Sequence, residues 1–200
     1  MKRIIALTLV LCSLLLLVAC NNDVVIGGKP SLEPYKNAIA ATSPKSVKLT
    51  TTLTTDLYEQ PLTGEYNITF ADDGSATVEY SYTLFNEVAS DAVTNPVKEY
   101  SGTATIDADG NVTGDDEIGG QLVAAARISF NLDDSKMTYS ASSGTLTANI
   151  KAENTAAVLG AATGADTVLT VSIADGVVVG ATITYETSFG PAVITCTYNK

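Results

Sequence analysis

Apolar and polar residues alternate with a period of two along most of the chain. Between residues 46 and 54, Val47, Leu49 and Leu53 alternate with lysine and threonine. Because successive side chains of a strand point to opposite faces, this spacing predicts a β-strand with one buried face. The same alternation predicts further strands at 64–71, 76–84, 98–107, 128–132, 137–141, 146–150, 168–173, 177–187 and 192–198.

Two segments have helical spacing instead. In the first, Ser31 is a candidate cap, and the residue before Pro44 is pushed out of the α region, so the helix ends there. Its apolar positions recur every three or four residues, at Leu32, Tyr35, Ala38, Ile39 and Thr42. The second is a short helix at 153–159, closed by Gly160 as a left-handed cap. A helix of about ten residues is not stable alone in water, so the first must pack on the sheet.

Three Asp-Gly steps separate alternating runs, at Asp73-Gly74, Asp109-Gly110 and Asp175-Gly176. Such steps tolerate the positive φ angles that tight hairpin turns require. Strands joined by hairpins pair antiparallel. The sequence therefore predicts an α+β fold: a single curved antiparallel sheet of about nine or ten strands, an N-terminal helix and one short late helix.

The first 20 residues have another pattern. Lys2 and Arg3 precede an apolar run from residue 4 to 19, and Cys20 follows. A basic start, an apolar run and a small residue before the end are typical of an export signal. The alternatives are a transmembrane helix and a plain secretory signal. The run of about 16 residues is shorter than the roughly 20 that span a bilayer, and a plain signal does not need the cysteine.

The closing residues Leu17-Val18-Ala19-Cys20 resemble the lipobox of bacterial lipoproteins. This resemblance implies that residues 1–19 are removed and that the sulfur of Cys20 carries a diacylglyceryl group. It also implies a lipid-anchored protein on the extracytoplasmic face of the cell envelope. The chain then divides into a signal peptide (1–19), a lipidated cysteine with a flexible tether (20–30) and a single mainly antiparallel domain (31–200).

The chain is strongly acidic, with 11 basic and 22 acidic residues and a formal net charge of −11. Loss of Lys2 and Arg3 with the signal lowers the charge further. No basic patch is left for phosphate backbones, so we expect no nucleic-acid partner. Anionic headgroups should also repel such a surface, so the acyl chains on Cys20 must hold the protein at the membrane.

Cys196 is the cysteine that remains once Cys12 has left with the signal and Cys20 is acylated, so no intramolecular disulfide is expected. An unpaired thiol in an oxidising compartment is either a reactive site or a small buried hydrophobe. Because Cys196 lies in a strand-like run, the buried interpretation is favoured.

The order of elements brings a second resemblance. A lipobox, a short tether, an amphipathic helix, a proline and then antiparallel strands with a late short helix resemble the lipoprotein-carrier superfamily of half-barrel proteins, over the stretches 32–53 and 146–185. The resemblance implies a concave sheet that holds a lipid or acyl chains and is closed by helices. It has no residue-level motif, so it transfers no binding residue. The richness in threonine and alanine departs from the family's large apolar cavity linings.

Candidate ligand-binding residues are aromatic or apolar. Tyrosine offers both a ring and a hydroxyl, and four tyrosines fall in neighbouring predicted strands, where they line a pocket or simply pack against each other. Two further candidates lie on the apolar face of the first helix. The six candidates are Tyr35, Ile39, Tyr66, Tyr80, Tyr82 and Tyr100.

The acidic segment 107–117 invites a calcium interpretation. An EF-hand loop needs glycine at position six and a carboxylate at position twelve. Counted from Asp107, these positions hold Val112 and Ile118. The segment therefore fails the EF-hand pattern, and a solvated turn is the simpler interpretation, with a looser divalent-cation site as the alternative.

Enzyme chemistry finds little support. The chain has no histidine, so a serine or cysteine nucleophile lacks its usual base and the usual zinc sites lose a ligand. Carboxylate pairs occur at Asp72-Asp73 and Asp133-Asp134, where predicted turns favour acids for structural reasons. We expect no enzyme, no cofactor and no metal.

Two functions remain. The first is a membrane-anchored lipoprotein that binds or carries a hydrophobic, lipid-like ligand on the concave face of the sheet. The second is an envelope surface or assembly module that binds another envelope protein or a polymer through the threonine-rich outer face. The space between the first helix and the sheet distinguishes them, because a carrier needs a cavity and an assembly module needs a filled core.

Overall fold

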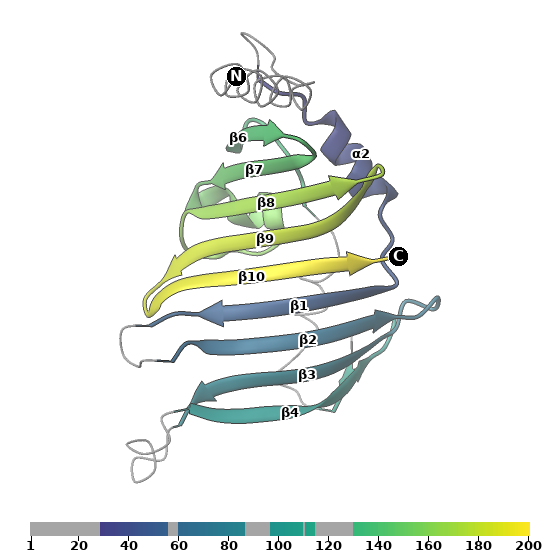
Figure 1. Ribbon diagram of the computed structural model, residues 1–200, viewed down its shortest axis with the longest axis vertical. Coiled ribbons are helices and arrows are strands. Elements are labelled where there is room, and N and C mark those ends of the chain that lie inside the picture. Colours follow the sequence, from purple (N-terminus) through teal and green to yellow (C-terminus); the bar gives the residue numbers. More distant parts are fainter. Residues whose placement is uncertain (1–28, 56–59, 87–96, 110, 115–129) are drawn as a thin grey trace, which may run out of the picture.

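The computed structural model describes residues 29–55, 60–86, 97–109, 111–114 and 130–200. These residues form one open sheet of ten strands with helices on one side (Figure 1). The strands are β1 Ser46–Leu53, β2 Leu62–Phe70, β3 Ala76–Phe85, β4 Val97–Ile106, β5 Val112–Thr113, β6 Met137–Ser142, β7 Thr145–Ile150, β8 Thr167–Ala174, β9 Val177–Thr187 and β10 Gly190–Asn199. The helices are α2 Glu33–Ala41, the 3₁₀ turn η1 Ala152–Asn154 and α4 Thr155–Leu159.

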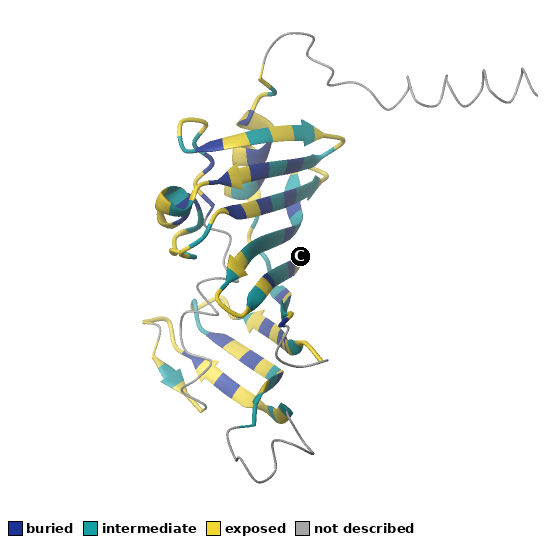
Figure 2. Cartoon of the chain, turned by 90° about the vertical axis from the view of Figure 1, so that its left-hand side faces the viewer, coloured by how far each residue is buried: buried dark blue, intermediate teal, exposed yellow. Residues whose placement is uncertain are grey.

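The predicted fold class is confirmed: the sheet is single, antiparallel, curved and not closed (Figure 2). Its order is β5-β4-β3-β2-β1-β10-β9-β8-β7-β6. Two sequential meanders, β1–β5 and β6–β10, therefore meet where the first strand pairs with the last. Leu49 faces Cys196 on one side and Tyr66 on the other.

The alternating apolar and polar residues of the strands lie on opposite faces of the sheet, as expected. The inner face, on the side of the helices, holds the buried apolar residues, among them Leu49, Val78, Leu146 and Leu169, each 0% exposed. The outer face holds polar residues. One row of hydroxyls crosses six neighbouring strands: Thr50, Thr195, Thr182, Thr170, Thr147 and Ser140.

Helix α2 lies on the inner face, with its main contacts on β9 and β8. It buries Tyr35 and Ala38, as the helical spacing predicts. The Ser31 hydroxyl accepts the N–H of Glu33 at 3.2 Å, close to its expected capping role. At the other end, Thr42 donates to the Ala38 carbonyl at 2.6 Å and accepts the N–H of Val178 at 2.8 Å, so it fastens the helix to β9.

The strand predicted at 128–132 is wrong where the structure describes it. Phe130 and Leu132 are buried but belong to no strand. The reason is a backbone hydrogen bond from the Asn131 N–H to the Val158 carbonyl, 2.8 Å long, which ties the segment to α4. The alternating apolar residues here pack under a helix instead of joining a ladder. Residues 128 and 129 lie outside the described residues.

Two further local predictions agree with the structure, whereas the turn predicted at Asp109-Gly110 includes Gly110, which lies outside the described residues. The short late helix ends at Gly160 with φ 78°, the left-handed cap expected. The β8–β9 hairpin turns at Asp175 and Gly176, with φ 52° and 75°. Every described element lies between residues 29 and 200, so this segment contains the whole described fold. Among the described helices, none is both long and apolar enough to cross a membrane.

Candidate functional site

The inner face of β1–β4 carries a cluster of stacked tyrosines. The Tyr82 ring centroid lies 6.4 Å from that of Tyr66, 5.7 Å from Tyr80 and 5.3 Å from Tyr100. Strand register explains the arrangement, because Tyr66 faces Tyr80 and Tyr82 faces Tyr100 across neighbouring strands. The structure therefore brings the four strand tyrosines together on one face; it does not test whether they bind a ligand.

Two glycines make room for these rings. A methyl group at Gly102, opposite Tyr80 on β4, would overlap the Tyr80 hydroxyl. A methyl group at Gly64 would lie 2.6 Å from the Thr51 hydroxyl and 2.8 Å from the Tyr66 ring. Aromatic rings that cover strand glycines compensate for the missing side chains. The rings of Tyr66 and Tyr80 therefore lie flat against the sheet instead of standing out from it.

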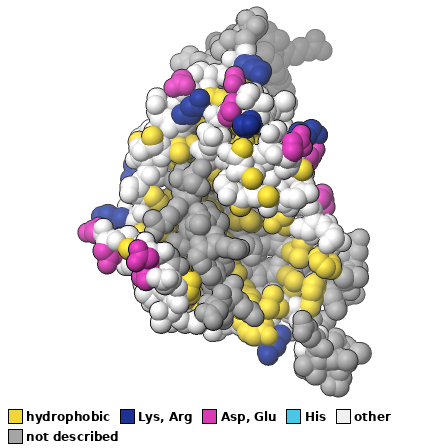
Figure 3. Space-filling view, turned by 180° about the vertical axis from the view of Figure 1, so that it is seen from behind, with side chains coloured by type: hydrophobic (Ala, Val, Ile, Leu, Met, Phe, Trp, Pro, Cys, Tyr) yellow, Lys and Arg dark blue, Asp and Glu magenta, His cyan; other side chains and the backbone are white. Residues whose placement is uncertain are grey.

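An open groove of about 270 Å³ lies next to this cluster, at the ends of β1, β3 and β9 and the starts of β2 and β10. The side chains that line it from the inner face are mostly apolar. They are Leu53, Leu62, Tyr66, Tyr82, Leu84, Tyr185, Ala192 and Ile194, together with Thr51 and Thr187. Figure 3 shows this face, with hydrophobic side chains gathered over its lower strands. We call this the tyrosine groove.

Hydrophobic residues also lie exposed at the groove. Leu84, part of the lining, is 38% exposed. Phe189, in the β9–β10 turn, is 54% exposed, and its N–H binds the hydroxyl of the groove-lining Thr187 at 3.1 Å. Exposed aromatic residues at the edge of an apolar groove are typical of binding sites and not of inert surface.

The Tyr66 hydroxyl in the groove is neutral. Burial raises the pKa of Tyr66, and the Thr51 hydroxyl beside it only partly offsets that effect. Tyr66 therefore stays a phenol at neutral pH and offers hydrogen bonds without a charge. Lys98 lies 4.9 Å from the Tyr100 ring centroid, so one cation borders the cluster.

The two helix candidates lie elsewhere. Tyr35 is 5% exposed and Ile39 is half-buried, and both belong to the core between α2 and the sheet. Neither lines the tyrosine groove. A depression of about 170 Å³ lies at the end of α2, around Thr42, Val178 and Tyr198. The space between α2 and the sheet, where a carrier was expected to hold its ligand, is filled by buried side chains. The open groove lies over the other half of the sheet. Helical periodicity marked Tyr35 and Ile39 as apolar, but it did not show on which half of the sheet the helix packs.

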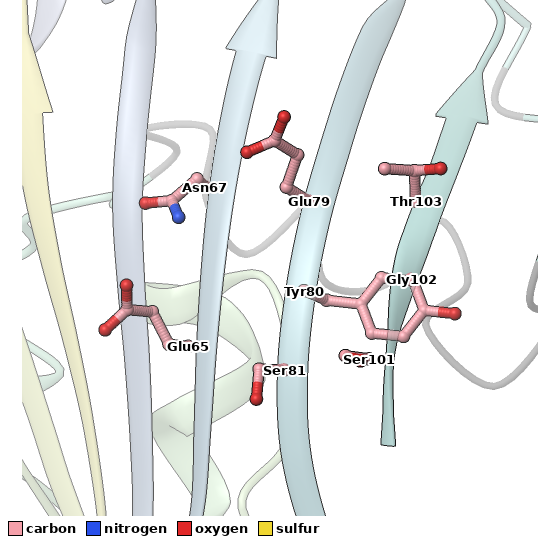
Figure 4. Close-up of a pocket in the computed structure, with 8 residues that line it drawn as sticks. All are labelled: Glu65, Asn67, Glu79, Tyr80, Ser81, Ser101, Gly102 and Thr103. Atoms are coloured by element: carbon pink, nitrogen blue, oxygen red, sulfur yellow. The ribbon is translucent and has the colours of Figure 1, made fainter.

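A shallow depression of about 410 Å³ opens on the other side of β2–β4 (Figure 4). Polar side chains of the outer face line it: Glu65, Asn67, Glu79, Ser81, Ser101 and Thr103. Glu65 pairs with Lys48 at 2.9 Å, and this hydrogen bond lowers the pKa of Glu65. Tyr80 and Gly102 complete the lining, so the outer depression combines charged and polar side chains with one aromatic residue, whereas the tyrosine groove is mainly apolar.

The described part of the acidic segment is a hydrogen-bonded turn. The Asp107 carboxylate accepts the N–H groups of Asp109 and Asn111 at 3.0 and 2.8 Å, and the Asn111 amide at 2.8 Å. The Asp107 carboxylate oxygens therefore act as hydrogen-bond acceptors within the turn. Asp115, Asp116 and Glu117 lie outside the described residues, as does the lipidation candidate Cys20. Within the described ranges, no three acidic, histidine or cysteine side chains gather as metal ligands.

Cys196 is buried, 4% exposed, as the strand pattern predicts. Burial raises the pKa of its thiol, which keeps it protonated and unreactive. The neighbouring Tyr198 hydroxyl is buried too. Cys196 approaches it, but the hydroxyl makes no hydrogen bond to any described residue.

Comparison with known proteins assigns no family. No protein-family model matches the chain, and no curated protein matches it. Among solved structures, the chain is similar to the crystal structure of LprF from Mycobacterium bovis, at 16% identity and a TM-score of 0.44, over 85% of this chain and 94% of that one. It is also similar to the dehydratase domain from the CurF module of Curacin polyketide synthase, at 10% identity and a TM-score of 0.22, over 80% of this chain and 76% of that one. The functional argument therefore rests on the chain's own geometry.

Proposed function

We propose that the protein is an extracytoplasmic lipoprotein, anchored through an acylated Cys20, that binds a hydrophobic, lipid-like ligand in the tyrosine groove. The observation that carries the proposal is the groove itself: about 270 Å³ of open, mainly apolar space on the inner face, beside four stacked tyrosines. Apolar concavities with a few well-placed hydroxyls are the usual form of small-molecule sites.

The size of the groove narrows the ligand class. Sites for drug-sized ligands measure roughly 300–1,000 Å³, and this groove measures about 270 Å³. It suits one alkyl chain or one ring system, not a whole diacyl lipid. The neutral hydroxyls of Thr51 and Tyr66 orient the polar end of such a ligand without demanding a charge.

We further propose that the protein binds and does not catalyse. The groove contains hydroxyl groups, but among the described residues that line it none is a histidine, lysine or carboxylate able to act as a base. Because its pKa is raised, Tyr66 is protonated at neutral pH and its phenolate is not available as a general base. Binding without turnover fits a carrier or sensor of hydrophobic molecules.

Dodecanoic acid provides the test. The probe is titrated by calorimetry and native mass spectrometry into residues 20–200 carrying Cys20→Ser, since 29–200 hold every described element. We expect one bound molecule. Ala192 lines the groove and is 8% exposed, so Ala192→Phe fills the space and weakens binding at least about tenfold, or ~1.4 kcal/mol.

Thr195→Phe is the matched control, because Thr195 lies on the same strand but points to the outer face. The proposal fails if no stoichiometric complex forms. It fails also if the Phe substitutions at positions 192 and 195 affect binding equally.

The outer face supports a second candidate function, an assembly module that binds an envelope protein or a polymer. The specific observation is the uncharged hydroxyl row through Thr50, Thr195, Thr182 and Thr170. A charge placed in the row, Thr182→Arg, should abolish partner capture in crosslinked cells and leave dodecanoic acid binding intact. Unchanged crosslinks would remove this candidate.

A further inference from the structure

A second cavity, of about 480 Å³, lies at the far end of the sheet from β4. It is formed where the turn before β6, the end of β7 and the start of β8 meet. Three lysines line it: Lys29, Lys136 and Lys151. Two carboxylates, Asp134 and Asp166, line it too. In a chain with net charge −11, a cavity with more lysines than acids is unusual. Figure 3 shows both signs of charge gathered near the top of the molecule, where β6 lies.

Lys29 is held at this cavity by contacts with β6. Its Nζ lies 5.9 Å from the centroid of the Tyr139 ring, a cation–π distance. The Tyr139 hydroxyl donates to the carbonyl of Pro30 at 2.8 Å, which fixes the backbone beside the lysine. Tyr139 therefore contacts both the Lys29 ammonium group and the backbone next to it, although Lys29 precedes the first helix.

Lys136 is positioned by the turn before β6. The Asp133 carboxylate accepts the N–H and the hydroxyl of Ser135 at 2.9 and 2.7 Å. The Lys136 N–H then closes the turn on the Asp133 carbonyl at 3.1 Å. Asp133 thus organises the turn, and Lys136, half-buried at its end, reaches the cavity.

Asp166 is already neutralised. Its carboxylate accepts Lys151 Nζ at 2.5 Å and the Ala152 N–H at 3.0 Å. Lys29 and Lys136 belong to none of the ion pairs among the described residues. Two ammonium groups at the cavity, those of Lys29 and Lys136, therefore lie outside every ion pair among the described residues, and they outnumber the one lining carboxylate, Asp134, that is also outside these pairs. Apolar side chains, among them Met137 and Ile150, complete the lining.

We propose that this cavity binds a phosphate-bearing anion between Lys29 and Lys136. Ammonium groups bind phosphate oxygens through charge-assisted hydrogen bonds, and the apolar floor suits a short carbon backbone attached to the phosphate. The phosphate belongs to a lipid headgroup or to a soluble ester. This site is separate from the tyrosine groove and does not depend on ligand binding there.

The test uses residues 20–200 with Cys20→Ser and follows backbone amides by NMR at constant ionic strength. One arm titrates inorganic phosphate and glycerol 3-phosphate against chloride. The other arm measures flotation with phosphatidylcholine vesicles that contain phosphatidylglycerol. We expect saturable shifts around residues 29, 136 and 151, and at least about tenfold weaker binding in the Lys29→Gln, Lys136→Gln double variant.

The matched control removes the same charge elsewhere, as Lys45→Gln with Lys98→Gln. If the protein binds the soluble phosphates, and the substitutions at positions 29 and 136 abolish this binding while the control pair does not, the ligand is a soluble ester. Vesicle binding alone, with the same dependence, supports a lipid headgroup. Absence of both kinds of binding, or equal loss in the control pair, overturns the proposal.

Discussion

The two halves of the sheet have the same strand pattern but different inner faces. Under α2 and α4, strands β6–β9 bury aliphatic residues completely, with Leu146, Leu169 and Val158 all 0% exposed. On β1–β4 the inner face is divided: Leu49 and Val78 are buried just as completely, but beside them stacked tyrosines, two glycines and half-buried leucines surround an open groove. One half fills its inner face throughout, and the other half fills only part of it and leaves space at the surface.

The difference shows that alternation and packing are separate properties. A period of two fixes which side chains share a face. What occupies the space above that face depends on the size and shape of the side chains and on where a helix lies. The four predictions below change one half at a time, in order of expected effect.

The largest effect is expected from a truncation in the packed half. Leu146→Ala leaves a cavity in a fully buried position and should lower the free energy of unfolding by about 3 kcal/mol. Leu62→Ala, in the partly buried lining of the groove, should cost about 1 kcal/mol or less. Urea unfolding of both variants measures the contrast. Equal losses would mean that the groove is packed like the core.

A smaller effect is expected from substitution of Gly102, the glycine that the Tyr80 ring covers. Gly102→Ala forces the Tyr80 ring off the sheet and should lower stability by about 1 to 1.5 kcal/mol through the lost stacking. The tyrosine signal in near-ultraviolet circular dichroism should change as well. Gly180→Ala is the control, because its nearest neighbour, the Cys196 carbonyl, lies 3.4 Å away. An unaltered tyrosine signal in Gly102→Ala would contradict the position of the Tyr80 ring flat against the sheet.

Two tyrosine hydroxyls should respond in opposite directions. Tyr198→Phe removes a buried hydroxyl that lacks a partner and should raise the free energy of unfolding by about 1 kcal/mol. Tyr66→Phe loses the interaction with Thr51 and should lower it by up to about 1 kcal/mol. Chemical denaturation at neutral pH checks both signs. A loss of stability in Tyr198→Phe would show that its hydroxyl has a partner after all.

The smallest effect expected is a loss of stability at alkaline pH. Burial raises the pKa of Tyr66 and of Tyr198 in the folded chain. The folded state therefore keeps these protons longer than the unfolded state does, so the stabilisation that these two hydroxyls contribute is complete below pH about 10 and is lost as pH rises beyond it. Thermal unfolding between pH 8 and 11 should show this fall, and the Phe variants of both residues should reduce it. If thermal stability rose between pH 8 and 11, deprotonation of the buried tyrosines could not be what governs it.

Local sequence pattern predicted most of the strands and both helices, because each depends on a short periodicity. It also placed Tyr66, Tyr80, Tyr82 and Tyr100 on neighbouring strands of one sheet, which their stacking agrees with. The pattern failed at Phe130 and Leu132, where apolar alternation served packing under α4 and not a ladder.

The location of the groove was beyond local pattern. It depends on the pairing of β1 with β10, which brings Leu53 beside Ala192 although these residues lie far apart in the sequence. It also depends on α2 resting on β8 and β9. No periodicity within a segment reports either arrangement. The lysines around the second cavity were missed for the same reason, since Lys29, Lys136 and Lys151 converge only in the folded chain.

The central position of β10 has a consequence for the time course of folding. The residues of β10, the last strand of the sheet in chain order, are the ones that join the two meanders. Until they arrive, β1 and β9 each present an unpaired edge, and contacts between sequence-distant strands form slowly. The single sheet is therefore incomplete until β10 has been made, even if each meander has already formed its own hairpins.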